Sequence, residues 1–319
     1  MKPCVFVTRP ILPGPLERLA AIAEVRVHEG EGLLSAAELR AQVTGIDALF
    51  CHLTDIVDEA LLEAAGPQLR IVANYAVGYN NIDLDACRRR GVAATNTPGV
   101  LTESTADIAF ALLLAVTRRL VEGDHMVRAG EFNGWAPQML LGHEISGKTL
   151  GIIGCGRIGQ AMARRARGFG LSLLYTQRKP LAGDLGRELG LEYVSLDELL
   201  EHSDFISLHC PLTPETHHLL GRTQLARMKR EAILINTARG PVVDEAALVE
   251  FLQKKELGGA GFDVYEHEPQ LSPGLAELDN VVLLPHIGSA TVETRRRMGE
   301  MVVDNILAAL QGRRPPNAL

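Results

Sequence analysis

The chain has 319 residues, of which 46% are hydrophobic and 22% are charged, an ordinary composition for a soluble globular protein. It carries 32 Lys and Arg against 39 Asp and Glu, a formal net charge of -7, which argues against binding to nucleic acid or to an anionic membrane surface. The five scattered cysteines include no CxxC pair and argue against a disulfide framework or a metal site. Since the sequence shows neither a signal peptide nor a membrane span, we expect a cytoplasmic protein.

Short apolar or β-branched runs recur along the chain, separated by segments with helical periodicity. Several runs are continuously apolar, which is typical of strands buried on both faces of a parallel sheet. The repetition of strand and helix predicts an α/β fold, and the pattern restarts near Gly147, which predicts two sets of strands. The first set comprises Cys4–Thr8, Asp47–Cys51, Leu69–Ala73 and Val92–Thr95. The second comprises Thr149–Ile153, Leu171–Tyr175, Asp204–His209, Ala232–Asn236, Gly259–Val264 and Val281–Leu284.

Two long helical segments accompany the second set. Residues 105–123 are apolar for most of their length, which predicts a helix buried between layers. Residues 291–311 are amphipathic and carry the chain away from the second set. If this helix returns to the first set, the first domain is built from both ends of the chain. Residues 130–147, which include Trp135, predict an exposed excursion.

A glycine-rich turn follows the predicted strand at 149–153. Gly154, Gly156 and Gly159 form a G-x-G-x-x-G pattern, which is weak alone but here lies between an apolar strand and a helix rich in Ala and Arg. In a dinucleotide site the first glycine permits the tight turn, the second lets a pyrophosphate approach the backbone, and the third lets the helix pack on the strand. The helix N-terminus, at Arg157 and Ile158, offers N–H groups to the phosphates. The alternative is a turn with a structural role only.

The end of the next strand predicts which dinucleotide is preferred. An NAD site usually has Asp or Glu there, whereas this chain has Gln177, Arg178 and Lys179. A guanidinium can hold a 2′-phosphate by charge-assisted hydrogen bonds, and no carboxylate is present to repel it. We therefore predict NADPH as the preferred cofactor, with NADH also possible. The alternative is a solvated Arg-Lys turn beside a site that accepts both.

Three later segments each place polar residues at the end of a predicted strand. They carry Arg239, Glu268 and His286, and the carboxyl ends of parallel strands face one crevice. The arginine can anchor the carboxylate of a 2-oxo acid and polarise its carbonyl, the histidine can supply a proton, and the carboxylate can orient the imidazole and stabilise its protonated form. Taken singly, each residue also has a structural interpretation as a surface ion pair or a loop side chain.

Together these motifs resemble one family. The ordered set GCGRIGQ, INTARGPVVDEAAL, GFDVYEHEP and LLPHIGSAT, with ANYAVGYNNID and TNTPGVLTESTADIAFALLLA, is similar to the D-isomer-specific 2-hydroxyacid dehydrogenases over nearly the whole chain. Within that family it looks most like the glyoxylate and hydroxypyruvate reductases. The resemblance implies two Rossmann-like, doubly wound parallel-sheet domains with a cleft between them, and a homodimer. Residues 1–98 and 289–319 would form a discontinuous substrate domain, and residues 99–288 the dinucleotide-binding domain.

The resemblance also implies roles for single residues. The family's catalytic Arg, Glu and His map onto Arg239, Glu268 and His286, whereas the similar formate dehydrogenases have Gln in place of the Glu. The backbone of Val77 and Gly78 maps onto the loop that binds the substrate carboxylate, and Asp263 maps onto the acceptor of the nicotinamide carboxamide. The other residues expected to line the cofactor cleft are Thr105, Pro211, Thr216, Thr237 and Gly288.

Three further positions have two interpretations each. Leu53 and Tyr75 shape the substrate pocket in one interpretation and are ordinary core residues in the other. Trp135 either reaches the substrate site of a partner subunit or packs at the subunit interface without touching substrate. His217 and His218 have no carboxylate or cysteine pattern around them in the sequence, so we predict surface residues rather than metal ligands.

These observations predict an enzyme, an NADPH-preferring reductase of small 2-oxo acids such as glyoxylate and hydroxypyruvate, which gives D-glycerate from the latter. A 2-ketogluconate reductase or a 3-phosphoglycerate dehydrogenase would use the same three catalytic residues. From another class, the transcriptional corepressors that resemble this family use the fold as a dinucleotide-sensing binding module. The compact length favours the enzyme.

Overall fold

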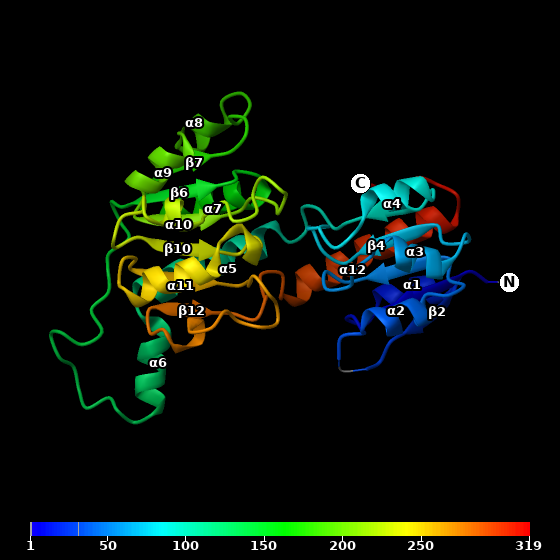
Figure 1. Cartoon of the computed structure of the whole chain (residues 1–319), viewed down its shortest axis with the longest axis horizontal. Helices are drawn as coiled ribbons and strands as arrows, with labels where there is room; N and C mark the ends of the chain where they lie inside the picture. Colours follow the sequence, from blue (N-terminus) through cyan, green and yellow to red (C-terminus); the bar gives the residue numbers. More distant parts are fainter. Residues whose placement is uncertain (1, 31) are drawn as a thin grey trace. The chain divides into compact units, whose positions relative to one another are not determined.

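The computed structural model describes residues 2–30 and 32–319 and divides into two compact units. Unit 1 comprises Met1–Leu101 and Ser289–Leu319, and unit 2 comprises Thr102–Gly288. Each unit contains one parallel sheet flanked by helices (Figure 1), which confirms the predicted fold class of two α/β units. Within the residues described, no helix combines the length and the apolar character needed to cross a membrane.

Unit 1 contains a five-stranded parallel sheet in the order β2-β1-β3-β4-β5. The two central strands β3 and β4 are buried at every position, as their continuously apolar sequences predict. Strand β2 was not predicted, because its sequence EVRV forms a partly exposed edge strand with little apolar signal. The strands are β1 (Cys4–Val7), β2 (Glu24–Val27), β3 (Ala48–Cys51), β4 (Ile71–Asn74) and β5 (Ala93–Thr95).

The last long helix of the chain belongs to unit 1. It begins after Thr291, whose hydroxyl accepts the N–H of Thr294 at 3.1 Å, and it packs against α1 and β4. The chain then ends beside the sheet, where the N–H of Leu319 donates to Ala94 O at 2.9 Å. Both ends of the chain therefore contribute to this unit. Its helices are α1 (Pro15–Ala20), α2 (Ala36–Gln42), α3 (Glu59–Ala65), α4 (Leu84–Arg89) and α12 (Val292–Leu310).

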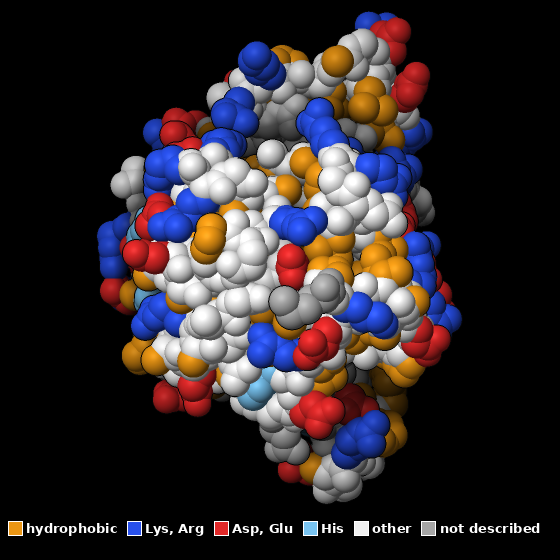
Figure 2. All heavy atoms as spheres, turned by 90° about the vertical axis from the view of Figure 1, so that its right-hand side faces the viewer, with side chains coloured by type: hydrophobic (Ala, Val, Ile, Leu, Met, Phe, Trp, Pro, Cys, Tyr) orange, Lys and Arg blue, Asp and Glu red, His pale blue; other side chains and the backbone are white. Residues whose placement is uncertain are grey.

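The surface of unit 1 carries charges of both signs. Acidic and basic side chains are interspersed on the face seen in Figure 2. Many of them pair, as Arg89 does with Glu59 at 2.5 Å and Arg88 with Asp85 at 2.7 Å. Because these pairs are exposed, each contributes little to stability.

A buried polar cluster lies at the carboxyl ends of β1 and β3. The hydroxyl of Thr8 donates to Asp55 Oδ2 at 2.5 Å, so only its lone pairs are available to His52 Nδ1 at 2.8 Å. The neutral ring of His52 must therefore carry its proton on Nδ1 and donate it to Thr8. The rings of Phe50 and Tyr75 flank this imidazole. The position thus favours a neutral histidine.

This neutral histidine predicts a loss of stability in mild acid. Burial and, after it, the charges of Arg9 and Arg295 lower the pKa of His52 to about 3. The unfolded chain binds a proton at this residue below about pH 6.5, so the stability is fully present above that pH and falls as the pH decreases toward the folded-state pKa. At about pH 4.5 this residue is expected to cost about 2–3 kcal/mol of unfolding free energy.

Urea unfolding at neutral and acidic pH measures this effect. The variant His52→Gln cannot titrate in this range, so its unfolding free energy is expected to depend less steeply on pH. His202→Gln, which replaces an exposed histidine of unit 2, is the matched control and keeps the wild-type slope. Equal slopes in the wild type and in His52→Gln would contradict the prediction.

Unit 2 contains a seven-stranded parallel sheet in the order β12-β11-β10-β9-β6-β7-β8. The chain runs from β6 outward through β7 and β8, then crosses to β9 on the other side of β6. The strand order therefore reverses between β6 and β9, and ligands of open α/β sheets bind at the carboxyl ends of the strands at such a point. The strands are β6 (Thr149–Ile153), β7 (Ser172–Thr176), β8 (Leu191–Tyr193), β9 (Phe205–Leu208), β10 (Ile233–Asn236), β11 (Gly259–Phe262) and β12 (Val281–Leu283).

The helix predicted at residues 105–123 is wrong in its extent. It begins earlier, at Thr102, and ends at Thr117, and a second helix follows at Leu120. The break lies at Arg119, which has a left-handed φ of 53° and bonds Glu122 through two guanidinium nitrogens at 2.7 and 2.9 Å. The first helix is buried as predicted and packs against β10 and β11.

The helices of unit 2 cover its sheet, with one extension. The helix α6 and the irregular residues after it extend away from the sheet (Figure 1), and Trp135 in this segment is 79% exposed. This confirms the predicted excursion. The helices are α5 (Thr102–Thr117), α6 (Leu120–Arg128), α7 (Arg157–Gly168), α8 (Leu185–Leu189), α9 (Leu196–His202), α10 (Arg222–Leu225) and α11 (Glu245–Gln253), with short 3-10 turns η1 (Gly240–Val242) and η2 (Leu275–Glu277).

Candidate active site

The glycine turn joins β6 to α7 at the point where the strand order reverses. Gly154 has a φ of 90°, and a Cβ there would lie 2.6 Å from the backbone nitrogen of Cys210 beyond β9. A Cβ on Gly159 would overlap the carbonyl oxygen of Gly154, so the helix can pack this closely only with glycine. A Cβ on Gly156 would meet nothing within 4 Å. The first and third glycines are required by the fold, whereas the second faces open space.

The start of α7 fits the phosphates of a dinucleotide. No side chain caps this helix, so its first N–H groups carry the partial positive charge of a helix N-terminus. The hydroxyl of Thr237, after β10 of the same sheet, is buried, and no partner for it lies within the described residues. Burial raises the pKa of Cys155 to about 12, so this thiol stays protonated in the turn. An open glycine, an uncapped helix and an unsatisfied hydroxyl agree with a cofactor site.

The end of β7 places Gln177 against the glycine turn. Its Oε1 accepts the N–H of Cys155 at 3.1 Å, and its Nε2 donates to Lys179 O at 2.7 Å. The amide is therefore held inside the turn, while Arg178 and Lys179 are exposed. The charge of Arg178 acts on Glu215, whose pKa is lowered mainly by its hydrogen bond with Thr213. Arg178 thus lies beside the loop that follows β9.

That loop contains two of the residues expected to line the cofactor. The hydroxyl of Thr216 donates to Pro211 O at 2.6 Å and accepts the N–H of Thr213 at 2.8 Å. The hydroxyl of Thr216, which was expected to face the cofactor, therefore stabilises the conformation of its own loop.

Arg239 stands in the turn after β10, held by a buried amide. Asn236, which is 1% exposed, accepts the N–H of Ala238 and donates to Arg239 O, both at 3.0 Å. Burial lowers the pKa of Arg239, and the charge of Glu268 opposes this effect. The next residue, Gly240, crosses the backbone of Tyr265 so closely that any Cβ would overlap its carbonyl group. Neither Asn236 nor Gly240 was predicted from the sequence, although an Asn directly at a strand end is a recognisable signal.

Glu268 and His286 form a direct pair. His286 Nδ1 lies 2.9 Å from Glu268 Oε2, and the N–H of Tyr265 donates to the other carboxylate oxygen at 3.0 Å. Burial would raise the pKa of Glu268, but the hydrogen bond and charge of His286, together with the Tyr265 N–H and the charge of Arg239, lower it. The two side chains are 27% and 26% exposed, so solvent and a small molecule can reach them. The arginine, the carboxylate and the histidine therefore act on one another.

Asp263 holds the turn that carries His286. Its Oδ1 accepts the N–H of Ile287 and its Oδ2 that of Gly288, both at 2.7 Å, and the side chain is 1% exposed. The hydroxyl of Thr105 donates to Gly288 O at 3.3 Å from the other side. His286 itself has a φ of 56°, a left-handed conformation that is uncommon for a side chain of its size. These contacts stabilise the strained turn, a role for Asp263 that the sequence did not indicate.

The other substrate candidates lie in unit 1 or in the excursion. Val77 and Gly78 follow β4, and their carbonyl groups accept the side-chain amides of Asn96 at 2.7 Å and Asn74 at 2.9 Å. These bonds fix the conformation of the loop. Leu53 directly follows His52 at the end of β3, and Trp135 lies in the exposed excursion of unit 2.

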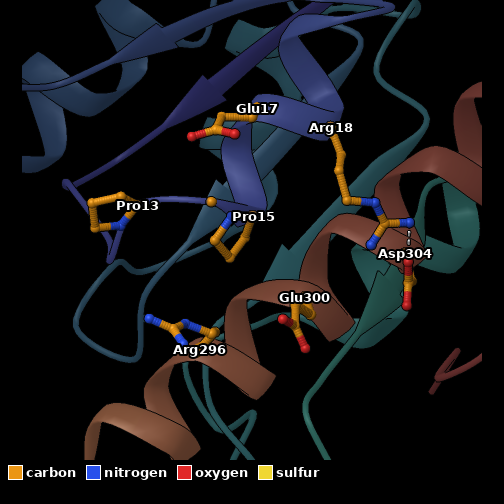
Figure 3. A pocket seen from close by; sticks show the side chains of 8 residues that line it. Pro13, Pro15, Glu17, Arg18, Arg296, Glu300 and Asp304 are labelled. Carbon is orange, nitrogen blue, oxygen red and sulfur yellow. Dashed lines mark hydrogen bonds and ion pairs between the residues drawn. The ribbon is translucent and has the colours of Figure 1, made fainter.

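Unit 1 also contains a hollow of about 510 Å³, which none of these residues lines. It is formed by α1, the loop before it and α12 (Figure 3). Arg18 reaches from α1 to Asp304 on α12 at 2.8 Å. Its lining includes none of the residues that the sequence selected, and it is not a candidate site. The lining residues are Pro13, Gly14, Pro15, Glu17, Arg18, Arg296, Glu300 and Asp304.

The chain is similar to proteins of known function. Residues 110–288 match the family model described as D-isomer specific 2-hydroxyacid dehydrogenase, NAD binding domain. A glyoxylate reductase of Thermococcus litoralis is 51% identical over an alignment of 323 positions, which covers 99% of this chain and 96% of that protein.

Two solved structures extend the comparison. The crystal structure of a Thermus thermophilus protein matches with a TM-score of 0.93 at 48% identity, with 99% of each chain covered. An NADPH-dependent glyoxylate/hydroxypyruvate reductase of Sinorhizobium meliloti, crystallised with NADP and malonate, matches with a TM-score of 0.87 at 35% identity, covering 100% of this chain and 97% of that one.

Proposed function

Because the chain belongs to the D-isomer-specific 2-hydroxyacid dehydrogenase family, we propose that it reduces small 2-oxo acids, glyoxylate to glycolate and hydroxypyruvate to D-glycerate, with NADPH preferred over NADH. The observation that carries this proposal is the pair of His286 and Glu268, 2.9 Å apart, with the charge of Arg239 acting on the same carboxylate. The relatives named glyoxylate reductase support the substrate class.

The three side chains divide the chemistry between them. Glu268 engages His286 Nδ1, so Nε2 is the nitrogen able to give a proton to the carbonyl oxygen of the substrate. The carboxylate stabilises the imidazolium from which that proton comes. Arg239 binds the substrate carboxylate and polarises the carbonyl as negative charge develops on its oxygen. The nicotinamide cofactor, when bound, supplies the hydride for the carbonyl carbon, and His286 afterwards takes a new proton from solvent.

The cofactor preference rests on the residues after β7. Gly154, Gly156 and Gly159 with the start of α7 would hold the pyrophosphate, and Arg178 with Lys179 would bind the 2′-phosphate of NADPH. Gln177 is uncharged and is folded into the turn, so no carboxylate at this position repels that phosphate. Asp263, Thr237 and Gly288 would lie toward the nicotinamide end.

Replacing Arg178 with alanine tests this preference. A hydrogen bond to a charged group contributes about 1.5–3 kcal/mol, so the KM for NADPH is expected to rise roughly 10- to 100-fold while the KM for NADH stays unchanged. Arg187→Ala, at an exposed arginine of α8, is the matched control and is expected to change neither constant. An unchanged ratio of the two constants in Arg178→Ala would refute the 2′-phosphate assignment.

Unit 1 is proposed as the substrate domain. The backbone N–H groups of Val77 and Gly78 would bind the substrate carboxylate, and Leu53 would limit the size of the substrate. We also propose a homodimer, because α6 and the excursion expose several large apolar side chains that a second copy would cover. These are Leu120, Val121, Val127, Phe132, Trp135 and Leu141.

Steady-state oxidation of NADPH and NADH with four substrates tests the whole proposal. Turnover of glyoxylate or hydroxypyruvate is the expected result. Faster turnover of 2-ketogluconate would instead identify the protein as a 2-ketogluconate reductase of the same family. Pyruvate serves as the comparison that lacks the terminal hydroxyl group of hydroxypyruvate. Tight dinucleotide binding without turnover of any of the four would instead favour a dinucleotide-sensing binding module.

A further inference from the structure

A second cluster of titratable side chains lies beside the candidate active site. His217 and His218 follow one another in the loop after β9, and their rings are stacked with centroids 4.1 Å apart. His218 Nε2 lies 2.6 Å from Oε1 of Glu266, a residue of the loop after β11. One ligand atom from each of the three side chains lies within 4.8 Å of the other two. The sequence could not indicate this cluster, because the carboxylate is 48 residues away from His218.

Other contacts hold the side chain of Glu266 and the backbone of His218 in place. Glu266 Oε2 accepts the N–H of Glu245 at 3.2 Å, and the N–H of Glu266 donates back to Glu245 Oε1 at 2.6 Å. His218 has a left-handed φ of 49°, and its N–H donates to Pro241 O at 2.8 Å. His217 is exposed, and its ring stacks on that of His218. Binding a ligand here would therefore cost conformational entropy mainly at the side chain of His217.

We propose that His217, His218 and Glu266 form a binding site for a divalent transition-metal cation of the zinc type. Two imidazole nitrogens and one carboxylate oxygen are a donor set that zinc accepts, with water as the fourth ligand, whereas Mg²⁺ and Ca²⁺ prefer oxygen ligands alone. The cation takes the place of the proton between His218 Nε2 and Glu266 Oε1. In the neutral ring that proton moves through solvent from Nε2 to Nδ1, so that Nε2 is free to bind the metal.

The required movement is small. Tetrahedral zinc with ligands at about 2.0–2.1 Å separates neighbouring ligand atoms by roughly 3.3 Å. The atoms of His218 and Glu266 must therefore move apart by less than about 1 Å. His217, at the surface, can rotate to complete the set.

The site is joined to both loops that carry the proposed catalytic side chains. Glu266 is two residues before Glu268, and the preceding residue, Tyr265, packs on Gly240 directly after Arg239. His218 contacts the Arg239 loop as well, through Pro241. Filling the site is therefore expected to shift Arg239 and Glu268 and to lower turnover. This consequence rests on the proposed function, whereas metal binding itself does not.

Zinc binding to the whole protein, measured by competition with a chromophoric chelator, tests the proposal. The wild type is expected to bind one equivalent, and His217→Ala is expected to weaken binding by roughly tenfold or more. His143→Ala removes an exposed histidine elsewhere in unit 2 and is expected to bind as the wild type does. Equal zinc affinity in the wild type and in His217→Ala, or no binding at micromolar zinc, would overturn the proposal.

Zinc inhibition of turnover separates this site from the candidate active site, where His286 and Glu268 also offer metal ligands. Zinc is expected to inhibit turnover in the wild type but not in His217→Ala, which retains the basal rate because it lies outside the catalytic set. Inhibition that persists in His217→Ala would place the inhibitory zinc elsewhere and refute the coupling. If no substrate is turned over, the chelator competition still decides on the metal site, so failure of the proposed function is distinguishable from failure of this inference.

Discussion

Replacing His286 with asparagine is expected to lower kcat by about 10²–10⁴, the range that general acid catalysis contributes. Asparagine tolerates the left-handed backbone of this position better than most residues do, and its amide can still donate to Glu268. The turn held by Asp263 therefore remains intact. What the variant loses is the second ring nitrogen, which is the proposed source of the proton.

The comparison with His286→Ala separates chemistry from folding. Alanine at a φ of 56° is strained, so this variant is expected to lose thermal stability as well as activity. His286→Asn is expected to keep the wild-type melting temperature and dinucleotide affinity. Steady-state kinetics with glyoxylate measure the loss, and full activity in either variant would rule out His286 as the acid.

Arg239→Lys is the second variant with a large expected effect. Lysine keeps the charge but loses the planar fork that binds a carboxylate through two hydrogen bonds. The expected result is a fall in kcat/KM of roughly 10²–10³, with Arg239→Ala falling further, as when a donor to a developing oxyanion is removed. Both the KM for the 2-oxo acid and kcat are expected to worsen, because the guanidinium acts on the carboxylate and on the carbonyl.

The matched control for this substitution is Arg222→Lys. Arg222 pairs with Glu250 at 2.8 Å on the surface of the same unit, and the pair is exposed. Its replacement is expected to leave the kinetic constants unchanged, since exposed ion pairs contribute little. Unchanged kinetics in Arg239→Lys would mean that charge alone suffices and that the fork has no role.

The buried strands were predictable because both of their faces are covered. The runs at β3, β4 and β10 are apolar at nearly every position, and this pattern has few other interpretations. The edge strands β2 and β8 were not predicted. They are short and carry charged residues at partly exposed positions, so hydrogen bonding to one neighbour, rather than composition, makes them strands.

The helix break at Arg119 was hidden for a related reason. Residues 105–123 are apolar for most of their length, and no glycine or proline marks the left-handed residue that separates α5 from α6. A capping glycine would have signalled the end, but here an arginine takes that conformation and pairs with Glu122. The ion pair between Arg119 and Glu122 produces no hydrophobic periodicity, so the sequence pattern did not predict the helix break.

In the candidate site, too, features formed by neighbouring residues were predictable, whereas contacts between residues far apart in the sequence were not. The glycine turn was predicted from a strand, three glycines and a helix that are contiguous in sequence. The contacts of Asp263 with Ile287 and Gly288 join residues about 25 positions apart, and only the sheet order brings them together. A strand end predicts which residues can meet, but not which of their atoms bond.

The contact between Thr105 and Gly288 has a consequence for the modularity of the chain. Unit 2 begins at Thr102 and ends at Gly288, so its entry and exit are joined by one hydrogen bond three residues from the first boundary. A segment whose two ends are neighbours can be inserted into a host fold at little cost in loop entropy, and it can be excised as a closed piece. Residues 102–288 carry all seven strands of their sheet and the three proposed catalytic side chains. They are therefore the natural fragment for expression as an autonomous dinucleotide-binding protein.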